Sequence, residues 1–227
     1  MKERLGRRID LHTHSLLSDG VLLPSEIARR AEDLGFQAIA ITDHVDHSNL
    51  EWVLGKALTF VKEAEKHSYQ VEIYVGVEIT HVPPASIPVL ASKAKRLGAQ
   101  LVIVHGETLV EPVTPGTNLA AVTTPDVDIL AHPGLITLEE CEKASSNGVY
   151  LEISTRKGHC LANGHVAKMA EKVGAKLVVN TDLHAPEDFV GQEEAFKVAL
   201  GSGLDEASAL KVVRDFPEEL LRKIRRA

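Results

Sequence analysis

The sequence has few aromatic residues, few cysteines and no long apolar run. Phe, Trp and Tyr together make up 4% of its 227 residues, and Cys141 and Cys160 are the two cysteines. Their separation fits neither a disulfide framework nor a zinc knuckle. No run of 18 apolar residues could form a membrane-spanning helix, and the N-terminal segment lacks the apolar stretch of a secretory signal. We therefore expect a cytoplasmic protein that makes no membrane contact.

An excess of basic charge is also missing. The chain carries 25 Lys and Arg against 32 Asp and Glu, a formal net charge of -7. Dedicated nucleic-acid binders usually carry a basic excess, so nucleic acid is an unlikely partner. The 44% hydrophobic and 25% charged residues are typical of a globular chain, and the length suits a single (β/α) barrel. Histidine, by contrast, is abundant at 11 residues, and it is the commonest metal ligand.

Short apolar segments alternate with amphipathic segments along the chain. Several of the apolar segments are continuous runs, which is typical of parallel strands covered on both faces. The expected strands span residues 8–11, 38–42, 73–79, 101–104, 128–131, 150–153 and 177–180. The expected helices span residues 24–34, 50–67, 85–97, 138–146, 164–173 and 187–200, with two more in 205–226 broken near Pro217. This order predicts a parallel α/β barrel of about seven strands, with an open doubly wound sheet as the alternative.

The longest expected loop spans residues 107–125 and contains three prolines and a glycine. Loops of this length inside a compact domain usually have a function. We therefore expect this segment to take part in function, for example as a lid.

Histidines and acidic residues gather at the ends of the expected strands. The C-terminal ends of parallel strands open on one face of a barrel, where barrel enzymes place their chemistry. Residues two apart on a strand project to the same side, as in the pairs His12/His14 and Asp182/His184. One such histidine alone is more often structural, but six at five strand ends predict a metal site. The nine candidate ligands are His12, His14, Asp19, His44, Glu78, His105, His132, Asp182 and His184.

The physical argument for metal is the cost of crowding these groups without it. Buried imidazoles and carboxylates would leave polar atoms unsatisfied and like charges close together. Divalent cations remove both problems because they bind imidazole nitrogens and carboxylate oxygens. Nine ligands exceed the need of one tetrahedral ion, so we expect two or three. Glu78, the only glutamate of the set, is the expected bridging ligand.

The ordered motifs resemble those of the PHP family, the polymerase and histidinol phosphatase superfamily, over residues 8–190. The motifs are His12-Thr13-His14, Ser18-Asp19-Gly20, Thr42-Asp43-His44, Gly76-Val77-Glu78, His105, Ala131-His132-Pro133-Gly134 and Asp182-Leu183-His184. The resemblance implies one domain over residues 1–227 with a distorted (β/α)7 barrel. It also implies hydrolysis of phosphate esters with two or three divalent ions, which in this family are zinc, manganese or iron.

The resemblance further implies three ligand groups. The first ion would be held by His12, His14, Glu78 and Asp182. The second would be held by Glu78, His105 and His132, and the third by Asp19, His44 and His184. Some three-metal members have histidine where this chain has Asp19, and others have aspartate. The third site is therefore expected either to bind its ion more weakly or to prefer a harder ion.

The mechanism implied by such a site is attack of a metal-bridging hydroxide on a phosphomonoester. Glu78, Asp182 and His184 are the expected catalytic residues. Arg156, Lys157 and His159 follow the sixth expected strand and are the candidate contacts for the substrate phosphate. Glu107 and Glu152 are candidates for binding the rest of the substrate.

A small phosphomonoester is the expected substrate, and histidinol phosphate is the type that the resemblance favours for a stand-alone chain of this size. A nuclease or nucleotide phosphoesterase on the same metal site is one alternative. A metal-binding domain without turnover is another, but all nine ligand positions are filled here. The sequence leaves the oligomeric state open.

Overall fold

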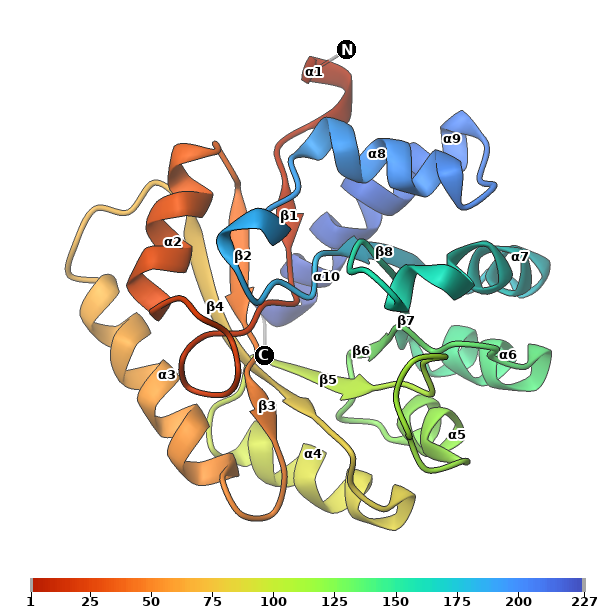
Figure 1. Ribbon diagram of the computed structural model, residues 1–227, viewed down its shortest axis with the longest axis horizontal. Coiled ribbons are helices and arrows are strands. Elements are labelled where there is room, and N and C mark those ends of the chain that lie inside the picture. Colours follow the sequence, from red (N-terminus) through yellow and green to blue (C-terminus); the bar gives the residue numbers. More distant parts are fainter. Residues whose placement is uncertain (1, 226–227) are drawn as a thin grey trace.

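The computed structural model describes residues 2–225 and is built around one parallel sheet (Figure 1). The order of the main strands follows the chain, and every strand pair is parallel. A short additional strand, β3 (His44–Val45), pairs with β4 beside this path. The main strands are β1 (Ile9–Asp10), β2 (Ala38–Ile41), β4 (Glu72–Ile79), β5 (Leu101–His105), β6 (Ile129–Ala131), β7 (Tyr150–Ser154) and β8 (Leu177–Asn180).

The sheet curls until its two edges nearly meet. Just beyond β1 and β8, Thr13 and Leu183 form a parallel bridge. The backbone N–H of His14 donates to the carbonyl of Leu183 at 2.7 Å. The expected distorted (β/α)7 barrel is therefore confirmed, and the open doubly wound sheet is wrong.

Helices surround this barrel (Figure 1). Those that follow the strands are α2 (Pro24–Asp33), α3 (Leu50–Ala64), α4 (Ile87–Arg96), α5 (Thr117–Thr123), α6 (Leu138–Asn147), α7 (Asn163–Val173) and α8 (Gln192–Gly201). The terminal ones are α1 (Lys2–Leu5), α9 (Glu206–Leu210) and α10 (Phe216–Ile224). Among the residues described, no helix is long and apolar enough to cross a membrane.

The two faces of each strand pack against different parts of the protein, because successive side chains of a strand point to opposite sides. In β4, Val75 and Val77 belong to the large core shared with the surrounding helices, whereas Tyr74 belongs to the core inside the barrel. Leu220 and Leu221 of α10 pack into that inner core and close one end of the barrel. Since Glu78 follows Tyr74 by four residues, it lies on the same face nearer the opposite, C-terminal end. The inside of the barrel thus changes from apolar to polar along each strand.

The expected loop at residues 107–125 contains α5, which the sequence analysis missed. Its sequence, Thr-Asn-Leu-Ala-Ala-Val-Thr, lacks a side-chain cap of its own. Instead, Glu107 accepts hydrogen bonds from the backbone N–H groups of Gly116 and Asn118, both at 3.0 Å. The helix start is therefore stabilised by a residue about ten positions earlier, which local pattern analysis cannot detect.

The expected helix break near Pro217 is wrong. The chain runs without a turn from α9 through a π-helical stretch, Lys211–Asp215, into α10. Pro217 stands in the first turn of α10, where its missing N–H and fixed φ fit a helix. Helix α8 begins at Gln192 rather than 187, because Pro186–Asp188 forms a separate 3-10 turn.

Two glycines with positive φ, one at each end of the barrel, differ in how tightly their surroundings are packed. Gly148 ends α6 with φ 68°, and a Cβ there would meet nothing within 4 Å. Gly134 has φ 60°, and a Cβ there would lie 1.9 Å from the carbonyl oxygen of Glu107. We expect Gly148→Ala to lower the free energy of unfolding by about 1 kcal/mol, the cost of the left-handed backbone.

Gly134→Ala should lower the free energy of unfolding by clearly more than Gly148→Ala does, because the segment at Glu107 must also move. Urea denaturation of both variants measures the difference. Equal losses would show that the contact at Gly134 is not tightly packed.

Candidate active site

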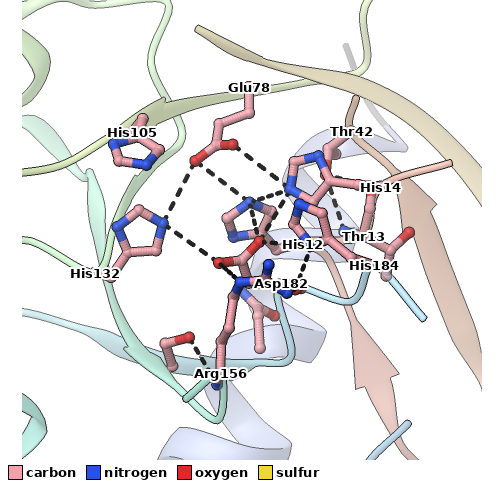
Figure 2. Close-up of polar contacts among 12 residues, drawn as sticks. His12, Thr13, His14, Thr42, Glu78, His105, His132, Arg156, Asp182 and His184 are labelled. Atoms are coloured by element: carbon pink, nitrogen blue, oxygen red, sulfur yellow. Dashed lines mark hydrogen bonds and ion pairs between the residues drawn. The ribbon is translucent and has the colours of Figure 1, made fainter. Parts of the chain in front are cut away.

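The nine candidate ligands converge at the C-terminal end of the barrel. Figure 2 labels all of them except Asp19 and His44. Six of them are almost completely buried: His12, His14, Glu78, His105, His132 and Asp182. His44 and His184 are partly accessible, and the side chain of Asp19 is 57% exposed. The nine residues therefore form one cluster that opens to solvent on the side of Asp19.

The first group brings together His12, His14 and Asp182. His14 Nε2 lies 3.1 Å from both His12 Nε2 and Asp182 Oδ1. Two atoms bound to one ion at about 2.1 Å lie roughly 3 to 3.5 Å apart. The three side chains therefore have the spacing of ligands around one cation.

A buried carboxylate fixes the orientation of His12. His12 Nδ1 lies 2.8 Å from Glu152 Oε2, and because a carboxylate only accepts, Nδ1 carries the proton. His12 Nε2 then faces Glu78 and Asp182. Burial opposes protonation of His12, yet the charges of Glu152, Glu78 and Asp182 raise its pKa well above the ordinary value. The same negative charges attract a divalent cation to Nε2.

Glu78 lies between the groups. Its Oε1 is 3.4 Å from His12 Nε2 and 3.6 Å from His132 Nε2, while its Oε2 is 3.5 Å from His14 Nε2. His44 Nδ1 lies 2.7 Å from the same Oε2. Both carboxylate oxygens of Glu78 thus have imidazole neighbours, which is the placement that a ligand shared by two ions needs. That Glu78 bridges two ions stays a prediction.

The third predicted group, Asp19, His44 and His184, also comes together, with His14 beside it. Asp19 Oδ1 lies 3.2 Å from His184 Nε2 and 3.5 Å from His44 Nε2. His184 Nδ1 donates to the backbone carbonyl of Asp182 at 2.8 Å. This bond orients the ring so that His184 Nε2 faces Asp19.

His159 lies among the imidazoles rather than on the surface of a loop. Its ring stacks on His132 with 4.1 Å between centroids, and Nδ1 lies 2.7 Å from the hydroxyl of Thr108. Burial, together with the charge of His132, lowers the pKa of His159 to about 3, so the ring is neutral. His105, His132 and His159 form a group that could hold a metal ion. The predicted phosphate contact is thus also a candidate ligand.

The cluster fits divalent cations because it holds most of the unsatisfied buried polar atoms in the described part of the chain. Buried polar groups in folded proteins nearly always have a hydrogen-bond partner. Apart from Gln192 Oε1, the side-chain atoms without one all belong to this region. They are His14 Nδ1, Glu78 Oε1, His105 Nδ1, His132 Nδ1 and Nε2, and Glu152 Oε1. Imidazole and carboxylate donors suit zinc, manganese and iron.

Backbone strain is concentrated at the same place. Among the residues described, the non-glycine residues with positive φ are His81, His132 and Asp182, at 51°, 27° and 52°. Such conformations cost roughly 1–3 kcal/mol each and persist where the surrounding structure holds them. All three residues contribute side chains to the cluster or to the cavity beside it.

A cavity of about 300 Å³ lies over the cluster. The guanidinium of Arg156 enters it, with Nη1 3.2 Å from the carbonyl of Asp182. Lys157 is exposed and is not one of the described residues that line the cavity. The lining residues are Ser18, Asp19, His44, Asn49, Thr80, His81, His105, Glu111, Arg156, His159, Asp182 and His184.

Neither Glu107 nor Glu152 is placed to bind the rest of a substrate. Glu152 is fully buried and accepts from His12 and from Asn180 Nδ2, so its role is to orient His12. The carboxylate of Glu107 accepts hydrogen bonds from the backbone at the start of α5 and stabilises that end of the helix. The sequence analysis missed Glu111, and the only available signal was its place in the long proline-containing loop.

The profile of the PHP domain matches residues 10–114. A protein of Methanocaldococcus jannaschii, named as uncharacterized, is 48% identical over 217 residues, which cover 96% of this chain and all of that protein. A probable phosphatase of Thermoanaerobacter sp. is 29% identical, covering 95% and 96% of the two chains. The ribonuclease P protein component 3 of Methanosarcina mazei is 25% identical, covering 91% and 86%.

Solved structures share the fold. Histidinol phosphate phosphatase of Lactococcus lactis, complexed with zinc, L-histidinol and phosphate, has a TM-score of 0.58 at 14% identity and 94% coverage of both chains. A solved chain of the metal-dependent tyrosine phosphatases YwqE of Bacillus subtilis and CpsB of Streptococcus pneumoniae has a TM-score of 0.61 at 16% identity, covering 95% of this chain and 94% of that chain.

The barrel, the cluster at its mouth and the match to the PHP domain define a metal-dependent phosphoesterase, a hydrolase that acts on phosphoric ester bonds. The chain belongs to the PHP family.

The contact between Glu152 and His12 predicts an effect on metal affinity. We expect Glu152→Gln to weaken binding of divalent ions roughly 10- to 100-fold, because the orienting carboxylate of a ligand histidine is lost. Titration calorimetry of the metal-stripped protein with Mn²⁺ or Zn²⁺ measures this. Glu171→Gln, which removes the same charge from an exposed position on α7, is the control. An affinity unchanged by Glu152→Gln would contradict the orienting role.

Proposed function

We propose that the chain is a single PHP domain over residues 1–227 that hydrolyses a small phosphomonoester of the histidinol phosphate type. The observation that carries this proposal is the small cavity directly over the ligand cluster, with the guanidinium of Arg156 inside it. A cavity of about 300 Å³ suits a small molecule.

Two or three divalent ions, zinc, manganese or iron, fit the cluster. We assign His12, His14, Glu78 and Asp182 to one ion, and Glu78, His105 and His132 to the second. Asp19, His44 and His184 are assigned to the third. When bound, such ions make water a nucleophile near neutral pH and neutralise charge on the phosphate oxygens.

The side chains around the ions have separate proposed roles in binding phosphate and in catalysis. Arg156 is the cationic donor in the cavity, and its planar guanidinium can hold two phosphate oxygens at once. Glu78, Asp182 and His184 are the proposed catalytic residues, because they place the ions next to the phosphate. The burial of most of these side chains supports a site that needs little reordering when substrate binds.

A nuclease or nucleotide phosphoesterase is the second candidate function. The relatives named ribonuclease P protein component 3 favour it. The net charge of -7 and the small cavity favour the small substrate instead, because a polyanion binds best to a basic surface. A metal-binding domain without turnover is disfavoured, because each of the nine ligand positions carries a metal-binding side chain and these side chains converge.

Metal analysis joined to a substrate screen tests the proposal. We expect two or three divalent ions per chain, and release of phosphate from histidinol phosphate faster than from nucleotides or single-stranded oligonucleotides. His132→Ala should abolish turnover with a modest effect on folding, as followed by circular dichroism. Full activity of that variant would remove His132 from the mechanism, and preferred cleavage of oligonucleotides would favour the nuclease.

Adjacent basic residues provide a matched test of the phosphate contact. We expect Arg156→Ala to raise KM and lower kcat/KM roughly 10-fold or more, since a charge-assisted hydrogen bond to phosphate is lost. Lys157→Ala should change either constant less than 2-fold, because Lys157 is exposed. Steady-state kinetics on the same phosphomonoester compares the two. The opposite order of effects would exchange their roles.

A further inference from the structure

A carboxylate outside the predicted ligand set enters the cluster from the loop between β5 and α5. Glu111 Oε2 lies 2.9 Å from His105 Nε2 and 3.3 Å from His81 Nε2, and its Oε1 lies 3.5 Å from His159 Nε2. Three imidazoles therefore face one carboxylate: one from the end of β5 and two from the segments that follow β4 and β7. The resemblance to the PHP family assigned no role to Glu111 or His81.

The loop that carries Glu111 is held on several sides. Glu107 binds the start of α5, and the hydroxyl of Thr108 contacts His159. The side chain of Val110 packs close to Gly158, where an added Cβ would lie 3.2 Å from it. The backbone N–H of Val113 donates to the carbonyl of Glu111 at 3.0 Å, which forms a turn. The position of the Glu111 carboxylate is thus built into the fold.

Two observations distinguish this group from an ordinary surface ion pair. His105 is 3% exposed, and its Nδ1 has no hydrogen-bond partner. His81 holds a left-handed backbone with φ 51°, which is costly for a residue with a Cβ. An exposed ion pair stabilises a fold by about 1 kcal/mol at most. This is less than the combined cost of an unsatisfied buried nitrogen and a strained backbone.

The spacing of the atoms is that of ligands. Oxygen and nitrogen atoms bound to one ion at about 2.0–2.2 Å lie roughly 3 to 3.5 Å apart. The contact of Glu111 with His81, 3.3 Å, falls in this range, and its contact with His105, 2.9 Å, lies at the lower edge. His81, His105 and Glu111 together form a group that could hold a metal ion.

We propose that Glu111 is an additional metal ligand, carried by the loop, which binds the cation held at His105 and closes its outer side together with His81. This inference rests on the proposed metal site. It gives the long loop a definite role: its carboxylate supplies a hard oxygen ligand to an otherwise imidazole-rich group. Substrate would then reach the ions from the side of Arg156 and Asp19, which also line the cavity.

The test uses the full chain, stripped of metal and titrated with Mn²⁺ or Zn²⁺ alone. Glu111→Gln keeps the size of the side chain and removes its charge, and Glu171→Gln removes a charge from an exposed site on α7. We expect Glu111→Gln to weaken one ion at least 10-fold, or to lose it from the bound count. The remaining ions and the Tm of the stripped protein should not change. Glu171→Gln should match the unaltered chain.

A spectroscopic readout separates ligation from the loss of a nearby charge. In the Co²⁺-loaded protein, Glu111→Ala should shift the visible absorption bands and alter their intensity, because the coordination of one ion changes. An unchanged spectrum and unchanged affinities would overturn the proposal. In that case a raised KM for the phosphomonoester would identify Glu111 as a substrate contact instead.

The two proposals fail in different ways. If the unaltered chain binds no divalent ion, the metal-dependent function fails and the role of Glu111 fails with it. If the unaltered chain binds two or three ions and both Glu111 variants bind them equally well with the same spectrum, only the role of Glu111 fails.

Discussion

Crowding of imidazoles and carboxylates in a buried space is the constraint on which the rest of this structure depends. Six of the proposed ligands are nearly inaccessible to water, and several of their polar atoms have no partner among the described residues. Such an arrangement is unfavourable by itself, because desolvation and like-charge repulsion both oppose it. Cations shared between the groups would turn the same arrangement into a stable one.

The barrel makes the crowding possible by dividing its interior along the strand direction. At one end, side chains of α10 fill the inside together with apolar residues such as Tyr74. At the other end, positions on the same strand face carry groups such as Glu78 and Glu152. Glu152 accepts a hydrogen bond from His12 Nδ1 and so fixes Nε2 as the nitrogen that would face a bound cation. Rigid strands and buried partners thus orient the ligands, which is what a metal site of defined geometry needs.

The segments that follow the strands orient site side chains that the strands alone do not place. His132 and Asp182 follow strands β6 and β8 with left-handed backbones, which turn their side chains back over the mouth of the barrel. The loop that carries Glu111 reaches the same place from β5 and is held by Thr108 and by the packing against Gly158. Strain and tight packing at these positions are stabilised by the surrounding core and are concentrated where the chemistry lies.

The sequence by itself determined the barrel and the nine candidate ligands that converge at its mouth. Apolar runs and strand-end positions are local patterns, and in a parallel sheet all C-terminal strand ends lie on one face. It did not determine α5, whose start is stabilised by Glu107 from a distant position. Nor did it determine the places of His159, Glu111 and Glu152, which are brought to the cluster by loop paths and side-chain packing. Those contacts join residues far apart in the chain, so only the tertiary structure could decide them.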